Sequence, residues 1–455
     1  MTEPSTSYRR LWTLAWPIIL SNITVPLLGL VDTAVVGHLP DAHYLAAVTL
    51  GATLFSFLFW GFGFLRMGTT GLTSQAAGRD DDEAVRNLLG QSLLLAIALG
   101  AGLIIAGSPL ISLGLWLLDG SEQASLLAAE YASIRLLSAP AVLANYAILG
   151  WFLGQQNSRV TLAIMLLTNG VNIVFDLLFV IGLGMTSNGV AWATVIADYS
   201  GLALGLWLIS RQLKRLEGRF LRHHLLRLAA YAELFNVNAN LFVRTLGLLF
   251  AMAFFTAQGA AQGDIVLAAN AVLLQFIMLT SYGLDGFAHA TESLIGRAIG
   301  KQNPHIFNST LRAATLLSVI TAGLATLAFL IGGQELIALL TGLDAVRDTA
   351  AIYLPWMIAL PLIAVWSYLL DGVFIGATAI KQMRNSVFIG LTVFLTLWWA
   401  FQWLFRQQLL ADGLLNHALW LSFMVFFIVR SGVLVAYLMP LRRRYGDTGE
   451  ATGTP

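Results

Sequence analysis

The chain has 455 residues, of which 58% are hydrophobic and only 11% are charged. Soluble domains carry about 25% charged residues and need them to stay dispersed. The composition therefore excludes a disordered chain, a nucleic-acid-binding protein and an ordinary soluble enzyme. With 25 basic and 24 acidic residues, the net charge of +1 gives no information about a polyanionic partner. Because the chain has no Cys, disulfides and thiolate metal sites are excluded as well.

Twelve apolar stretches are long enough to cross a bilayer, which takes about 20 residues in a helix. We therefore expect an all-α polytopic membrane protein with twelve transmembrane helices. The first stretch holds Pro17, Pro26 and Asp32, so we interpret it as a span and not as a cleaved signal peptide. Each proline favours a kink, and both are predicted hinges. The stretches are 11–36, 45–75, 87–108, 124–154, 160–182, 187–210, 229–258, 265–298, 308–333, 346–376, 385–405 and 416–440.

Basic residues fall almost entirely on one set of alternating connections, and only Arg347 and Arg406 fall on the other. Lys and Arg accumulate on cytoplasmic loops, so both termini are expected in the cytoplasm. Trp398, Trp399 and Trp403 lie near the outer end of the eleventh stretch, and we interpret them as part of an interfacial aromatic belt.

The two halves of the chain resemble each other. Leu45-Ala-Ala recurs 222 positions later as Leu267-Ala-Ala, and glycines stay in step at that offset. Six spans separate the copies, so both enter the membrane in the same direction. We expect two six-helix bundles related by a pseudo-two-fold axis along the membrane normal, with a substrate path between them. The glycine pairs at small-xxx-small spacing are expected to pack helices closely; they are Gly150/Gly154 and Gly372/Gly376.

This pattern predicts the domain organisation. Residues 1–210 form an N-terminal bundle and residues 229–440 a C-terminal bundle. A basic cytoplasmic linker, 211–228, joins them, and residues 441–455 form a cytoplasmic tail.

Several acidic residues lie within the expected spans. A carboxylate at mid-bilayer costs about 2.5–3.5 kcal/mol on the mildest scale, so it needs a partner or a water-filled cavity. One interpretation is static pairing with buried arginines; the other is a functional site. The acids are Asp32, Asp176, Asp198, Asp285, Glu292 and Asp371, and the arginines are Arg66, Arg135, Arg244 and Arg430.

Asp32 and Asp176 are predicted to form a cation-coupling site. Asn172 and Asp176 are four residues apart and share a helix face, and Thr194 in the sixth span adds a hydroxyl. Burial beside a like charge favours proton exchange near neutral pH, and the same oxygens suit a sodium ion. The residues leave the choice between proton and sodium open.

The C-terminal half has acids where the N-terminal half has none. At the repeat offset, Leu149 corresponds to Asp371 and Gly63 to Asp285, which indicates that the halves have diverged in task. Acids beside Met and aromatic residues suit an organic cation. The substrate candidates are therefore Asp371, Asp285, Met278 and Phe287, with ordinary packing or lipid contact as the alternative for Met278 and Phe287. Apart from a possible sodium site, no metal site or cofactor is expected.

Three motifs carry a resemblance to a known family. Leu14-Ala-Trp-Pro-Ile-Ile19, Ser21–Leu39 and Leu369–Thr378 resemble the multidrug and toxic compound extrusion (MATE) family, and the last two resemble its DinF branch. The resemblance implies a monomeric antiporter of the bacterial inner membrane that exports cationic or amphipathic organic compounds against inward proton or sodium flow. It implies a bend at Pro17 and a span-ten acid at Asp371. It also implies an N-lobe cation site at Asp32, Asn145, Asn172, Asp176 and Thr194.

Other functions remain as alternatives. A flippase of a lipid-linked precursor would need a cleft rich in Arg and Lys, whereas the expected mid-membrane charges are mostly acidic. A membrane enzyme would need a nucleophile with its base or a metal cluster, and the seven His residues form no ligand-spaced cluster; we predict no catalytic residue. A passive channel would explain the repeat and the internal acids less well than a transporter that works by alternating access.

Overall fold

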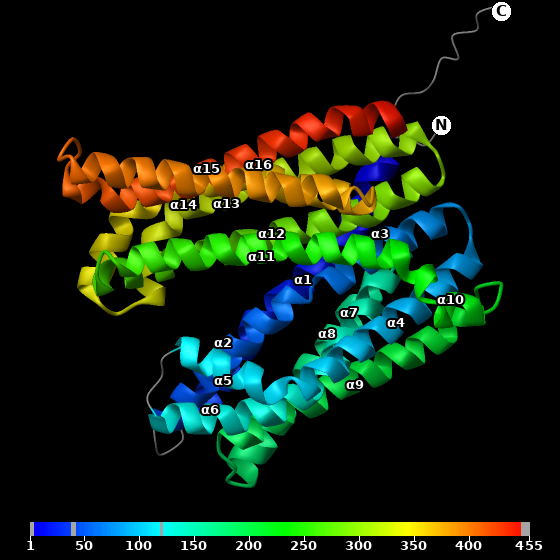
Figure 1. The fold of residues 1–455 in the computed structure, drawn as a ribbon, viewed down its shortest axis with the longest axis horizontal. Helices are drawn as coiled ribbons and strands as arrows, with labels where there is room; N and C mark the ends of the chain where they lie inside the picture. The colour runs from blue at the N-terminus through cyan, green and yellow to red at the C-terminus, as the bar shows by residue number, and fades with distance from the viewer. Residues whose placement is uncertain (1–3, 38–41, 119–121, 447–455) are drawn as a thin grey trace, which may run out of the picture. The chain divides into compact units, whose positions relative to one another are not determined.

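The computed structural model describes residues 4–37, 42–118 and 122–446, and a few side chains inside its helices, including that of Asp32, lie outside the description. Within this part of the chain the regular structure is helical (Figure 1). The helices are α1 (Pro4–Gly37), α2 (Ala42–Gly61), α3 (Phe64–Gly78), α4 (Asp82–Ile105), α5 (Gly107–Leu118), α6 (Glu122–Arg135), α7 (Ala139–Gly154), α8 (Ser158–Asp176), α9 (Ser187–Leu213), α10 (Arg222–Leu226), α11 (Ala232–Ala260), α12 (Asp264–Gly300), α13 (Pro304–Leu340), α14 (Asp344–Gly376), α15 (Ile380–Arg406) and α16 (Leu415–Tyr445).

Eleven helical segments of the described chain are long and apolar enough to cross a membrane. They correspond to eleven of the twelve expected spans. The remaining one, 11–36, falls in α1, several of whose side chains lie outside the description. The helices extend past the apolar stretches because polar caps lie beyond them: Asp81 caps α4 and Asn303 caps α13. The short helix α5 was not predicted.

The chain divides into two compact units. Unit 1 comprises Met1–Ala15 and Ala239–Pro455, and unit 2 comprises Trp16–Asn238. Each division falls inside a helix, after Ala15 in α1 and after Asn238 in α11. The first lies two residues before Pro17. Helix α1 nevertheless continues through Pro17 and Pro26, and their role as hinges stays a prediction.

The repeat is visible in the local geometry. Asp81 Oδ1 accepts from Ala84 N at 2.9 Å, and 222 positions later Asn303 Oδ1 accepts from Ile306 N at 3.0 Å. The residue before each cap has a positive φ, 55° at Asp80 and 50° at Gln302. The same turn thus precedes the same helix in both halves.

The predicted close packing of the paired glycines is confirmed. A Cβ on Gly150 would lie 2.4 Å from Arg66 O, and one on Gly372 would lie 2.3 Å from Ala288 O. Arg66 and Ala288 are themselves 222 positions apart. The contacts of α7 with α3 and of α14 with α12 are therefore equivalent, and in both a glycine lets backbone meet backbone.

The core of unit 1 is aromatic where α11, α15 and α16 meet. Ring centroids of Phe255 and Trp420 lie 4.5 Å apart, and those of Phe394 and Phe423 lie 5.8 Å apart. Trp398 belongs to this core at 1% exposure. The prediction that it contributes to a lipid-facing belt is therefore wrong, because its indole turns inward to bond Gln258.

Candidate functional site

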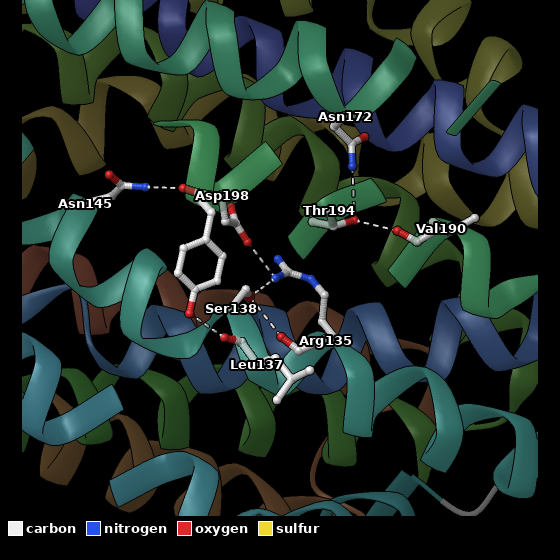
Figure 2. Close-up of polar contacts among 9 residues, drawn as sticks. Arg135, Leu137, Ser138, Asn145, Asn172, Val190, Thr194 and Asp198 are labelled. Atoms are coloured by element: carbon white, nitrogen blue, oxygen red, sulfur yellow. Dashed lines mark hydrogen bonds and ion pairs between the residues drawn. The ribbon is translucent and has the colours of Figure 1, made fainter. Parts of the chain in front are cut away.

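The predicted coupling residues on α8 and α9 meet inside unit 2. Asn172 Nδ2 donates to Thr194 Oγ1 at 3.0 Å, and Thr194 Oγ1 donates to Val190 O at 2.9 Å (Figure 2). Asn172 is 1% exposed. The hydroxyl is thereby held in one orientation by the amide on one side and by its own helix on the other.

Asp176 lies one helical turn beyond Asn172 and is 0% exposed. Helix α8 ends at this residue, and a π-helical turn, Leu177–Gly182, follows without interruption. Single π-helical turns are rare and occur frequently at functional sites. Sequence reasoning missed this turn, since its six residues are uniformly apolar apart from Gly182.

Asp32 lies in α1, but its side chain is outside the description. The predicted pairing of Asp32 with Asp176 therefore stays a prediction.

Asn145 on α7 takes part in a neighbouring polar group. Its Nδ2 donates to Asp198 O at 3.1 Å, so it bonds the backbone of α9 and not the side chains of Asn172 and Thr194. Thr194 and Asp198 are one turn apart on α9 and lie on the same face. The two polar groups are thus consecutive along one helix, as Figure 2 shows.

The second group contains a buried ion pair. Arg135 Nη1 lies 2.7 Å from Asp198 Oδ2, and both side chains are 13% exposed. Arg135 also donates to Ser138 Oγ, and its Cζ lies 5.6 Å and 5.5 Å from the ring centroids of Phe55 and Phe59. The guanidinium is therefore neutralised by a carboxylate and contacted by aromatic rings. Asp198 therefore has an arginine partner, as one of the two interpretations of the buried acids requires.

Unit 1 has a different charged centre. Asp371 Oδ2 accepts from both Arg244 and Arg430, whose side chains are 5% exposed. Nearby, Tyr368 and Ser281 share a hydrogen bond, and Ser367 and Ser431 share one of 2.8 Å. Asp371 is thus paired with arginines as well, and its role in substrate binding stays a prediction. The carboxylate proposed for an organic cation is already neutralised in this structure by two guanidinium groups.

The other substrate candidates lie in α12 with Asp285. Met278 is 49% exposed, whereas Phe287 is 1% exposed and packs on Trp12, with ring centroids 5.9 Å apart. This contact agrees with the packing alternative for Phe287, and the substrate role of these residues stays a prediction. Among the described residues, no three His, Asp or Glu side chains gather into a metal site.

Comparison with known proteins identifies the class to which this helical transporter-like fold belongs. The sequence profile of the MatE family matches residues 17–178 and 247–400. The chain is 42% identical over 435 residues to DNA damage-inducible protein F of Escherichia coli (strain K12), covering 95% of this chain and 92% of that protein. It is 29% identical over 201 residues to the probable multidrug resistance protein NorM of Geobacillus kaustophilus (strain HTA426), covering 42% of this chain and 43% of that protein.

Solved structures share the fold. A MOP superfamily transporter from Pyrococcus furiosus superposes with a TM-score of 0.84 at 20% identity, over 98% of this chain and 97% of that one. A MATE crystal structure in the bent conformation gives a TM-score of 0.84 at 20% identity, over 98% and 100% of the two chains. The chain belongs to the MATE family. It is a multi-pass membrane transporter of a family that carries small organic compounds, and it is not an enzyme.

Proposed function

We propose that the protein is a secondary antiporter that exports cationic or amphipathic organic compounds in exchange for protons or sodium ions by alternating access. The observation that carries the proposal is the fully buried carboxylate of Asp176, one turn from the bonded pair Asn172 and Thr194. A carboxylate is costly to bury at membrane depth, and carboxylate, amide and hydroxyl oxygens are ligands for a hard cation. Asp32 and Asn145 complete the proposed set, Asp32 from α1 and Asn145 from α7.

The coupling is energetically reasonable. Loading a proton or a sodium ion would neutralise the buried carboxylate and lower its desolvation cost. A membrane potential supplies about 2.3 kcal/mol per charge per 100 mV, which is enough to drive export uphill. The π-helical turn after Asp176 gives α8 a place where backbone hydrogen bonds can rearrange when the charge changes.

Dye efflux from vesicles tests the proposal. Proton and sodium gradients are imposed separately on the native protein, on Asp176→Asn and on Asp32→Asn. We expect both variants to lose most gradient-driven efflux while keeping dye binding. Glu130→Gln is the matched control, because it removes an exposed carboxylate of the same unit that bonds only Asn188 in the described chain. Full efflux by both aspartate variants would disprove the coupling role.

A second candidate, a flippase of a lipid-linked precursor, is favoured by one observation. Two buried guanidinium groups, those of Arg244 and Arg430, converge on Asp371, and Arg pairs suit anionic phosphate groups. Reconstituted vesicles with a fluorescent lipid diphosphate distinguish the two functions. Transbilayer movement of that lipid without gradient-driven dye efflux would favour the flippase.

We also propose twelve crossings in two six-helix bundles, with both termini cytoplasmic in a bacterial inner membrane and a monomeric protein. The basic connections and the repeat described above support this arrangement.

A further inference from the structure

A cavity of about 550 Å³ lies in unit 1, away from the charged centre at Asp371. It forms where α11 and α15 end and α16 begins. Its lining consists of three Trp, three Gln and one Arg, together with Ala261 and Leu415, and no acidic residue. The volume is in the range of ligand sites, and a few polar groups among large apolar ones is the composition expected of them.

Part-buried hydrogen bonds hold three of the side chains that line the cavity. Trp398 Nε1 donates to Gln258 Oε1 at 3.0 Å, and Gln262 Nε2 donates to Gln258 O at 3.2 Å. The last carbonyls of α15 accept from the chain's own amides, since Gln407 N bonds Trp403 O at 3.1 Å. These carbonyl groups already have hydrogen-bond partners, so a ligand in the cavity would contact side chains.

The polar side chains that line the cavity carry N–H donors, and one of them, Arg406, carries a full positive charge. Across the described residues, the guanidinium of Arg406 has no ion pair or hydrogen-bond partner. By contrast, Arg347 pairs with Asp344 at 3.6 Å and donates to Thr341 O at 2.7 Å. Gln402, Trp399 and Trp403, whose side chains carry amide and indole N–H donors, line the same cavity. A donor-rich site with a lone cation and no carboxylate suits an anionic oxygen ligand.

The cavity opens beside a surface suited to hydrocarbon. Trp399 and Trp403 are 62% and 59% exposed, and indole rings at the ends of membrane helices lie at headgroup depth. From them an exposed stripe runs back along α15 at helical spacing through Thr396, Thr392 and Phe388. The two threonine hydroxyls are bonded to their own helix at 2.8 Å and 2.9 Å, so the stripe presents carbon atoms.

From these observations we propose that the cavity binds the headgroup of one anionic phospholipid. The phosphate accepts from Arg406 and the neighbouring amide and indole donors, and the acyl chains lie along the stripe of α15. A small soluble anion would use Arg406 alone and would gain nothing from the stripe. Charge-assisted hydrogen bonds from a guanidinium to a phosphate are shorter and stronger than neutral ones.

Native mass spectrometry of the full chain in detergent tests the proposal. Phosphatidylglycerol is titrated against the native protein, Arg406→Gln and Arg347→Gln, with phosphatidylcholine as the zwitterionic lipid. We expect Arg406→Gln to weaken phosphatidylglycerol retention about tenfold, the loss of one charge-assisted contact. Arg347→Gln should leave retention unchanged, and Arg406→Lys should restore part of it. Because Arg406 is exposed, Arg406→Gln should unfold at the same temperature as the native protein when no lipid is present.

Three results would overturn the proposal. The first is equal retention of phosphatidylglycerol by the native protein and Arg406→Gln. The second is equal affinity of the native protein for phosphatidylglycerol and phosphatidylcholine. The third is displacement of the lipid by millimolar soluble glycerol phosphate or by maltose, which would assign the cavity to a soluble anion or a sugar.

Discussion

At the scale of single residues, the two units neutralise their buried charge differently. In unit 2 one guanidinium meets one carboxylate, at Arg135 and Asp198. In unit 1 two guanidinium groups meet the single carboxylate of Asp371. At the repeat offset Asp371 corresponds to Leu149, so this centre has no equivalent carboxylate in the other half. The predicted divergence of the halves is therefore visible in their charges.

The unit 1 centre predicts a large loss of stability on removing its carboxylate. Asp371→Asn leaves Arg244 and Arg430 buried without the carboxylate that they share, with only the longer-range charge of Asp285 near Arg244. Breaking a buried pair by removing one partner costs about 3–5 kcal/mol. Thermal unfolding of the purified protein in detergent should show a clearly lower midpoint. The control is Asp344→Asn, because Asp344 is 91% exposed and its pair with Arg347 at 3.6 Å is a surface one, worth about 0–1 kcal/mol.

Equal midpoints for Asp371→Asn and Asp344→Asn would contradict the idea that Asp371 holds the two arginines. In that case the carboxylate would be neutral or hydrated, and its role as a substrate candidate would gain support.

At the scale of helices, sequence reasoning succeeded where one physical signal dominates. Long apolar runs predicted the spans because a bilayer demands about 20 apolar residues, and the repeated glycines predicted the close contacts later seen at Gly150 and Gly372. The sequence alone could not predict that Arg135 pairs with Asp198, 63 positions away, because pairing of distant residues depends on the tertiary fold. The π-helical turn after Asp176 and the inward-facing Trp398 were missed for the same reason: packing decides them, not local composition.

The glycine contacts carry a prediction at this scale. Gly150→Ala would place a Cβ 2.4 Å from Arg66 O, and Gly372→Ala would place one 2.3 Å from Ala288 O. Both obstacles are backbone atoms, so the helices must separate, and overpacking of this kind costs about 1–3 kcal/mol. We expect lower unfolding midpoints for both variants, and similar decreases because the contacts are equivalent.

The matched controls are Gly102→Ala in unit 2 and Gly323→Ala in unit 1. Nothing lies within 4 Å of a Cβ at either position, and replacing Gly by Ala in a helix is favourable by about 0.4–1 kcal/mol. If Gly150→Ala and Gly372→Ala unfold at the same temperature as these controls, the close approach of the paired helices does not contribute to stability.

At the scale of the whole molecule, each unit is a helical body built on the same internal contacts. The caps at Asp81 and Asn303 begin equivalent helices, and the glycine contacts join equivalent pairs. The two units differ in their buried polar groups. Unit 2 has a polar group with a buried carboxylate on α8 and α9, whereas unit 1 has two guanidinium groups around Asp371. The two halves thus share their helix contacts and caps but differ in the charges that they bury.

The proposed orientation gives the last prediction, which the composition makes easy to test. Because the chain contains no Cys, a single introduced cysteine reports its own position without background. Gly342→Cys and Lys301→Cys lie just outside the two ends of α13 (Pro304–Leu340). Lys301 is on a basic connection, which is retained in the cytoplasm. We therefore expect a membrane-impermeant maleimide added to intact cells to label Gly342→Cys and not Lys301→Cys. Both should label after permeabilisation, and the reverse pattern in intact cells would invert the proposed topology.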